Sequence, residues 1–334
     1  MMRKLIVPVL MVLLLAGCAP AVAPQSAATA APTTNVQTSA TVAAAPPAQV
    51  QQQTMGAATY IDGIGRQVTL AHPAERVVAL APSNTEILFA IGAGAQVVGR
   101  DSFSDYPAEV KNVPDIGGSL TTLNAEVILS KQPDLVLATP LTAPEQVAEL
   151  AKSGLIVYVL PNPKTFDDLF ANLETVGKLT GHENEAANLV ATLKARVEAV
   201  AAKLSNVTSR PIVYYELDGT DPSAPYTSGP DTFIDLIIRD AGGENFGANL
   251  KGEWVQISIE ELLARQPDVI LLGDSLYGGV TAEMVRARAG WEALSAVKQG
   301  KVFAFDDNLV SRPGPRLVDG LEVIAHLLHP DVFP

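Results

Sequence analysis

The chain has 334 residues, of which 48% are hydrophobic, and its formal net charge is −13. Such an acidic surface repels nucleic-acid phosphates, so we expect no nucleic-acid partner. Because Cys18 is the only cysteine, internal disulfides and thiolate metal clusters are excluded.

The first residues have the form of an export signal, which we assign to residues 1–18. Arg3 and Lys4 precede an apolar run, 5–15, that is too short to span a bilayer comfortably. The run ends in Leu15-Ala16-Gly17-Cys18, which resembles the bacterial lipobox. We therefore expect Cys18 to be lipidated and to become the new N-terminus. An ordinary signal peptide that contains a cysteine is the alternative.

Residues 19–57 are predicted to be a disordered tether. This stretch is rich in Ala, Pro, Thr and Gln, and its residues 19–56 carry no charged side chain. It has no amphipathic periodicity and cannot build a packed core. A tether behind a lipid anchor implies that the folded part acts close to a membrane surface.

Residues 58–164 are predicted to form a first α/β lobe. Short apolar runs alternate there with helical patterns, and this alternation is typical of a parallel sheet covered by helices. We expect a hairpin over 60–70, strands over 76–80, 96–99, 134–138 and 155–160, and helices over 86–91, 126–131 and 143–153.

Residues 165–208 are predicted to be a helical linker, and residues 209–334 a second α/β lobe. Apolar residues recur at helical spacing up to Leu204, with a break at Gly181 and a long helix over 183–204. The α/β alternation then restarts. We expect strands over 211–217, 268–272 and 301–305, and helices over 232–241, 259–265, 284–287, 291–296 and 315–328.

One sequence pattern occurs in both predicted lobes. Glu126 precedes Pro133 by seven residues, and Glu260 precedes Pro267 by the same interval. In both places Gln-Pro-Asp leads into an apolar run. A helix, a turn and a buried strand used twice indicate two related lobes.

Sequence signals for catalysis or metal binding are absent. There is no Gly-x-Ser-x-Gly elbow and no Walker-type loop, and Gly92-Ala93-Gly94 ends a predicted helix instead of opening one. None of the four histidines has a metal-ligand spacing; His326 and His329 fit a helix end. We predict no catalytic residues, no metal site and no cofactor.

Several segments together resemble the iron-siderophore and cobalamin branch of the periplasmic binding proteins, which are solute-binding lipoproteins of ABC transporters. The resemblance covers nearly all residues from Tyr60 to the C-terminus. It is carried by Arg76-Val-Val-Ala-Leu-Ala-Pro-Ser-Asn-Thr-Glu86 up to Gly94, Val98-Gly99, Ser104-Asp-Tyr-Pro107, Pro114-Asp-Ile-Gly-Gly118, Gly242-Gly-Glu-Asn245 and Ser311-Arg-Pro-Gly-Pro-Arg-Leu317. It implies two Rossmann-like lobes with parallel-type sheets, joined by one long backbone helix, and a ligand in the cleft between them.

The resemblance also implies functional residues. Glu126 and Glu260 match the glutamates that dock on arginines of the membrane permease. Phe103, Tyr226 and Trp254 match aromatic positions that line the cleft, and Arg312 matches a polar contact to the ligand. The segments around Tyr226 and Trp254 are polar and loop-like, which favours a ligand-binding role for both aromatics.

Two further side chains near these motifs have different expected roles. We expect Arg316 to pair with a carboxylate instead of the ligand, and Trp291 to pack in the core.

The implied function is capture of cobalamin, another corrinoid or a ferric siderophore, and delivery to the membrane subunits of an ABC importer by a lipid-anchored monomer outside the cytoplasm. Cobalamin binders often carry a tryptophan before the first docking helix, and residues 118–124 contain no aromatic. Ferric siderophores and haem therefore stay open as ligands. Three different functions compete with this one: a zinc or manganese binding protein, an extracytoplasmic hydrolase, and a sensor or adhesion lipoprotein.

Overall fold

The fold is taken from a computed structural model, which describes residues 57–118 and 123–333. Its first sheet has four parallel strands in the order β4-β3-β5-β6. The two central strands, β3 and β5, and the edge strand β6 are buried on both faces, as parallel strands covered by helices are expected to be. The strands of this sheet are β3 (Val77–Ala79), β4 (Val97–Arg100), β5 (Leu135–Ala138) and β6 (Val157–Val159).

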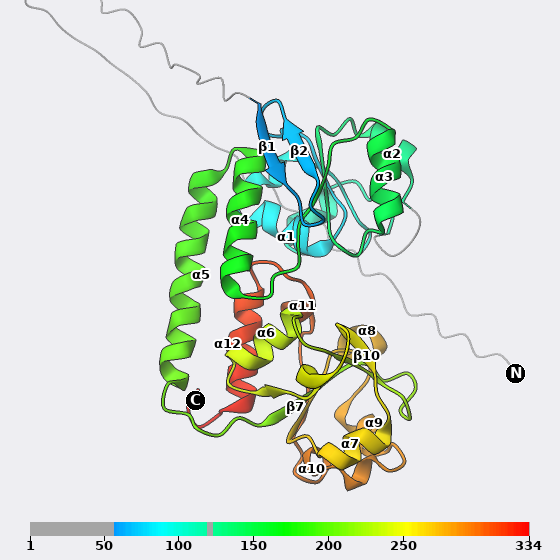
Figure 1. The fold of residues 1–334 in the computed structure, drawn as a ribbon, viewed down its shortest axis with the longest axis vertical. Coiled ribbons are helices and arrows are strands. Elements are labelled where there is room, and N and C mark those ends of the chain that lie inside the picture. Colours follow the sequence, from blue (N-terminus) through cyan, green and yellow to red (C-terminus); the bar gives the residue numbers. More distant parts are fainter. Residues whose placement is uncertain (1–56, 119–122, 334) are drawn as a thin grey trace, which may run out of the picture. The chain divides into compact units, whose positions relative to one another are not determined.

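The remaining elements of this half surround that sheet. The predicted hairpin is formed by β1 (Ala58–Ile61) and β2 (Gln67–Leu70), which pair with each other. The predicted helices are present as α1 (Pro82–Ala90), α2 (Ala125–Ser130) and α3 (Pro144–Lys152), and the short 3-10 turns η1 (Ala93–Gln96) and η2 (Ala108–Asn112) were not predicted. Figure 1 shows α2 and α3 on one side of the sheet and α4 on the other.

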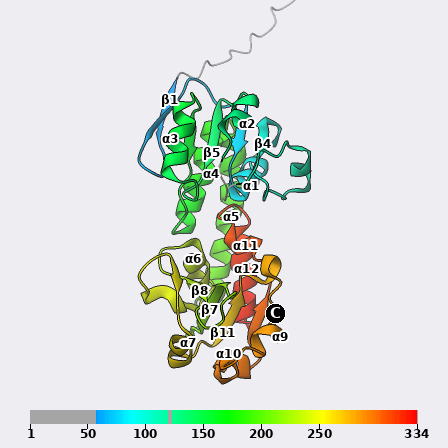
Figure 2. The same ribbon diagram turned by 90° about the vertical axis from the view of Figure 1, so that its right-hand side faces the viewer.

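The second sheet is mixed. Its order is β10-β8-β7-β11-β12, with β9 also pairing with β7. Strands β7, β9, β11 and β12 are parallel, whereas β8 runs antiparallel to both β7 and β10. Figure 2 shows β7, β8 and β11 side by side. The strands are β7 (Ile212–Asp218), β8 (Tyr226–Ser228), β9 (Glu244–Asn245), β10 (Trp254–Gln256), β11 (Val269–Leu272) and β12 (Val302–Ala304).

The loop interpretation of the segments around Tyr226 and Trp254 is wrong. Both residues start three-residue antiparallel strands, β8 and β10, in which Trp254 lies opposite Ser228 and Gln256 opposite Tyr226. These polar segments are strands because β8 pairs with β7 and β10 pairs with β8. Amino-acid composition alone does not indicate such pairing.

Most helices of the second half agree with the prediction within a few residues. The predicted helix 291–296 is an exception, because the chain is extended at Leu294 and forms a 3-10 turn before it and a separate four-residue helix after it. The four-residue helices α8 and α11 were not predicted, because one turn is too short to show an apolar period. The set is α6 (Phe233–Asp240), η3 (Phe246–Asn249), α7 (Ile259–Arg265), α8 (Ser275–Gly278), α9 (Ala282–Arg286), η4 (Trp291–Ala293), α10 (Ser295–Lys298), α11 (Asn308–Ser311) and α12 (Leu317–Leu328).

As predicted, one long helix, α5 (Glu183–Leu204), carries the chain from the first half to the second, and the shorter α4 precedes it (Figure 1). Helix α4 (Phe166–Thr180) begins with a capping box between Thr165 and Asp168, and it ends at Gly181, whose φ of 74° suits glycine. Helix α5 (Glu183–Leu204) follows and runs back along α4 and then along α12 (Figure 1). The predicted break at Gly181 is therefore confirmed. Within the described residues, no helix is long and apolar enough to cross a membrane.

One apolar core extends through both sheets. In β3, Val77 faces this core, and Val78 faces a second cluster under α2 and α3. In β7, Val213 faces the same shared core, and Tyr214 faces a third cluster that contains Trp291. Helices α4, α5, α6 and α12 fill the space of the shared core. Trp291 is fully buried, as predicted.

The repeated sequence pattern has the same local structure in both halves. Gln132 follows α2 with φ 49°, and Gln266 follows α7 with φ 47°. The next aspartates both accept backbone hydrogen bonds at the start of the adjacent strand. Asp134 accepts two, at 2.9 Å, just before β3, and Asp268 accepts one, at 2.8 Å, from the first residue of β7. The repeat is therefore a structural unit that ends each helix and aligns two neighbouring strands.

Candidate ligand-binding site

A cavity of about 210 Å³ lies between the two halves of the fold. The first half contributes the start of α1 and the segments after β4 and β5. The second half contributes α6, α8, α11 and the segment that follows α11. The lining residues are Ala81, Pro82, Ser83, Phe103, Thr139, Leu141, Asn162, Phe233, Tyr277, Asn308, Ser311, Arg312 and Pro313.

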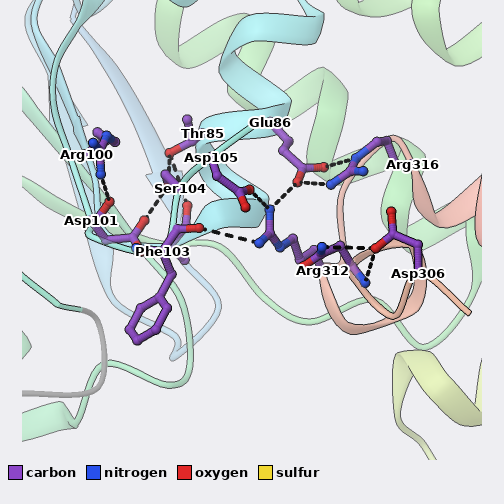
Figure 3. A network of polar contacts seen from close by, with 12 residues as sticks. Thr85, Glu86, Arg100, Asp101, Phe103, Ser104, Asp105, Asp306, Arg312 and Arg316 are labelled. Atoms are coloured by element: carbon purple, nitrogen blue, oxygen red, sulfur yellow. Dashed lines mark hydrogen bonds and ion pairs between the residues drawn. The ribbon is translucent and has the colours of Figure 1, made fainter. Parts of the chain in front are cut away.

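Arg312 forms the polar floor of this cavity, and its side chain is only 7% exposed. Its Nη1 donates to Glu86 Oε1 at 3.1 Å and to Asp105 Oδ1 at 2.6 Å. Its Nη2 donates to the Tyr277 hydroxyl at 2.9 Å and to the Phe103 carbonyl at 3.4 Å. Figure 3 shows the guanidinium between the two acidic side chains. Arg312 therefore holds together segments that are more than 200 positions apart in the sequence.

Glu86 is the second centre of this network. Its side chain is 2% exposed and accepts two hydrogen bonds from Arg316, at 2.9 and 2.6 Å, besides the one from Arg312. The Arg316 guanidinium also lies over the Tyr106 ring, 4.1 Å from its centre. The predicted pairing of Arg316 with a carboxylate is confirmed. Burial by itself lowers the pKa of Arg312, but hydrogen bonds to Asp105 and Glu86 raise it overall.

Phe103 projects from a turn that is fixed by buried polar contacts. Its side chain is 46% exposed, and its backbone N–H donates to Asp101 Oδ1 at 2.9 Å. Ser104 donates to the other Asp101 oxygen at 2.5 Å and also contacts the Thr85 hydroxyl of α1. Asp101 is fully buried, and this burial raises the pKa of its carboxyl. The turn presents an exposed aromatic ring to the cavity on a rigid backbone (Figure 3).

Trp254 and Tyr226 are not among the residues that line the cavity. They are 38% and 40% exposed, and their register on β10 and β8 places them on one face of the sheet. The Trp254 ring packs against Phe233, a lining residue, at 5.7 Å between ring centres. The structure therefore brings Phe103 and Arg312 to the cavity and places Trp254 against the lining residue Phe233. Tyr226 shares only the face of the sheet with Trp254.

Tyr277 was missed by the sequence reasoning. It is 64% exposed, lines the cavity, and donates from its hydroxyl to Asn308 Oδ1 at 3.0 Å. The signal was available, because Tyr277 precedes Gly278-Gly279 just after an apolar strand, and an aromatic in such a segment has the features used to select Tyr226.

The sequence comparison decides the family. Residues 77–309 match the family described as periplasmic binding protein. The chain belongs to the periplasmic binding proteins. It is 33% identical, over 82% of this chain and 86% of the relative, to YvrC of Bacillus subtilis, an uncharacterized ABC transporter substrate-binding lipoprotein. It is 32% identical to the cobalamin-binding protein of Halobacterium salinarum, over 81% and 74% of the two chains. The structure of the haem-binding protein RhuT of Roseiflexus sp. RS-1 matches with a TM-score of 0.69 at 30% identity, covering 78% of this chain and 99% of that one.

Periplasmic binding proteins act outside the cytoplasm and bind solutes, so the cavity between the two halves is the expected place for a ligand. The two predicted docking residues of this binding protein are exposed and occupy equivalent places. Glu126 is in the first turn of α2, and Glu260 is in the first turn of α7, which are the two helices of the repeated unit. Their docking role stays a prediction. Cys18 lies outside the described residues.

The described part of this binding protein contains no group of three or more His, Cys, Asp or Glu side chains arranged to hold a metal ion. Its polar anchors are instead the arginine network and the hydroxyl and amide groups around the cavity.

Proposed function

We propose that this binding protein captures a cobalamin-like corrinoid or a ferric siderophore and delivers it to an ABC importer. The observation that carries this proposal is the cavity between the two halves, which has aromatic side chains at its wall and a buried arginine network at its floor. A rigid, bulky ligand suits such a wall, since aromatic faces give contact area and a few polar groups fix orientation. The relative that is named a cobalamin-binding protein and the structural neighbour named a haem-binding protein support this choice of cargo.

The remaining parts of the proposal concern the protein's surroundings. Lipidation of Cys18 would anchor the chain at a membrane, with residues 19–57 as a tether, and the relative named a lipoprotein supports this. The protein works as a monomer without a cofactor and without catalytic chemistry. Glu126 and Glu260 dock on basic residues of the permease, where charge pairing sets orientation and encounter rate.

Isothermal titration tests the cargo. We expect saturable one-to-one binding of cyanocobalamin or of one ferric chelate to the purified protein. Phe103→Ala and Trp254→Ala should each weaken binding about ten- to a hundredfold, because each removes aromatic contact area or its support. Ile61→Ala, at an exposed apolar residue of the distant hairpin, is the control and should leave the affinity unchanged. A complete lack of binding to corrinoids, ferric chelates and haem would contradict the proposal.

An import assay tests docking separately. The double variant Glu126→Ala, Glu260→Ala should bind its ligand normally and lose most import. Glu145 and Glu283 provide a matched control, since they are also exposed glutamates in the first turn of a helix, α3 and α9. If the two double variants import equally well, the docking assignment is wrong.

A further inference from the structure

A second, larger cavity lies entirely within the second half of the fold, and no part of the proposed function uses it. Its volume is about 740 Å³. It opens at the carboxyl ends of three adjacent parallel strands, β7, β11 and β12, which is the edge where open α/β sheets bind ligands. The lining residues are Leu217, Asp218, Gly219, Thr220, Pro222, Gly273, Asp274, Tyr277, Gly278, Val280, Met284, Arg288 and Asp307.

Each of the three strands delivers one carboxylate to this cavity. Asp218 is the last residue of β7, Asp274 is the second residue after β11, and Asp307 is the third after β12. Hydrogen bonds from the Thr220 side chain and from the Thr220 backbone N–H, the latter at 2.8 Å, lower the pKa of Asp218. Burial raises the pKa of Asp307 to about 6, so this carboxyl is still mostly ionised at pH 7.5. Burial also raises the pKa of the Asp274 carboxyl. The ionised Asp218 and the mostly ionised Asp307 therefore give this edge of the cavity its negative potential.

The positive charge of the lining residue Arg288 does not cancel this negative potential. Among the described lining residues, Arg288 is the only cation, and it is already paired with the fully buried Glu216 at 2.5 and 2.9 Å. Acceptors are also in excess. One oxygen of Asp274 accepts from Gly219 at 2.9 Å, while the other has no hydrogen-bond donor among the described groups. The wall therefore offers acceptors and negative charge to a ligand, and few donors.

The two cavities share a wall. Tyr277 lines both of them, and its hydroxyl is the group that accepts from Arg312 at the floor of the first cavity. A ligand whose rigid body lies against Phe103 and Tyr277 can therefore extend a side arm past Tyr277 into the acidic cavity. Val280 and Met284 give this second cavity an apolar side on which the stem of such an arm can pack.

We propose that the cavity lined by Asp218, Asp274 and Asp307 is a subsite for a ligand arm that ends in hydrogen-bond donors, either a primary amide or an ammonium group. This inference rests on the proposed function and narrows its cargo. A carboxylate offers no donor and meets like charge there, so the subsite discriminates against ligands with carboxylate arms. An amide-bearing corrinoid or an ammonium-bearing siderophore is favoured over haem, which carries two carboxylates.

Two pairs of compounds test the subsite by isothermal titration on the whole protein. Cyanocobalamin is compared with its monocarboxylic derivative, in which one peripheral amide has become a carboxylate. Ferrioxamine B, with its free ammonium arm, is compared with its N-acetylated form. In at least one pair, wild type should bind the parent compound about tenfold more tightly, because charge-assisted hydrogen bonds are lost in the derivative.

Substitution of Asp218 tests whether its carboxylate causes the tighter binding of the parent compound. Asp218 is exposed and lies at the end of its strand, so the Asp218→Asn variant should fold normally. This variant should reduce the preference for the parent compound over its derivative, and Asp218→Lys should reverse that preference. Asp167→Asn on α4 makes the same charge change at an exposed site that lines neither cavity. It should keep the wild-type preference.

The outcomes separate the two proposals. Equal affinities within every pair that binds, or a preference that both Asp218 variants leave intact, overturn the subsite and leave the proposed function standing. If no corrinoid, no ferric chelate of any class and no haem binds, the proposed function fails and the subsite with it. If the only ligands that bind are ferric chelates without a donor-bearing arm, the subsite is overturned and the transport function stands. Tight binding of haem alone overturns the subsite and keeps the transport function.

Discussion

The buried ion pair between Glu86 and Arg316 has a counterpart of the same geometry on the protein surface. Arg316 donates to the two Glu86 oxygens at 2.9 and 2.6 Å, and Arg196 donates to the two Glu322 oxygens at the same two distances. The pairs differ in burial. The glutamate side chain is 2% exposed in the first pair and 42% in the second. Substitution of each glutamate by glutamine therefore measures the effect of burial at constant geometry.

We predict that Glu86→Gln lowers the free energy of unfolding by about 3–5 kcal/mol, because it leaves the buried charges of Arg316 and Arg312 without their shared partner. Glu322→Gln should cost only about 0–1 kcal/mol, because Arg196 stays in contact with solvent and with Asp319. The expected difference in unfolding free energy between the two variants is several times the uncertainty of a typical unfolding free energy extrapolated to zero denaturant.

Urea unfolding of both variants, followed by circular dichroism, gives the two values. The dependence of the unfolding free energy on urea concentration should stay at the wild-type slope in both variants, which would show that unfolding exposes the same amount of surface as in wild type. A cost below 1 kcal/mol for Glu86→Gln, or equal costs for the two variants, would refute the claim that the buried network holds the two halves together.

Three further predictions concern single residues. Tyr277→Ala should weaken ligand binding about tenfold in a titration, since the exposed ring lines the first cavity; unchanged affinity would remove Tyr277 from the site. Gly229→Ala should lower the melting temperature strongly, because a Cβ there would lie 1.9 Å from the Gly252 carbonyl oxygen, whereas Gly278→Ala meets only ordinary contacts and should be tolerated. Burial raises the pKa of Glu216 from 4.5 to about 7. Between these values the folded state holds a proton that the unfolded state has released, so stability should fall as pH rises from 4.5 to 7, by at most about 3 kcal/mol. Urea titrations at several pH values should show a smaller fall in Glu216→Gln, and an equal fall would contradict this assignment.

The sequence predicted most of the architecture because its strands are continuous apolar runs and its longer helices have a clear apolar period. Val269–Leu272 and the stretch before Leu204 are examples. Strands β8 and β10 could not be found in this way. They have three residues each, and their pairing depends on β7, which is distant in the sequence from β10. The local sequence pattern of a segment carries no information about which distant strand it pairs with.

The site was predicted in part. Phe103 and Arg312 were named and do line the first cavity, because the family motifs place them there. The partners of Arg312 could not be inferred, since Glu86 and Asp105 are more than 200 residues away in the chain. The acidic cavity was missed for a related reason. Asp218, Asp274 and Asp307 carry no signal singly and come together only when three strands align.

The shared apolar core has a consequence for how the protein folds. Strands of both sheets pack on the same cluster, to which α4, α5 and α12 also belong. Neither half has a complete hydrophobic interior of its own, so neither should be stable as an isolated fragment. Loss of one half should expose the apolar face of the other, and unfolding is then a single cooperative transition. In a protein that works outside the cytoplasm, such cooperativity limits partly open forms that could aggregate or be cleaved.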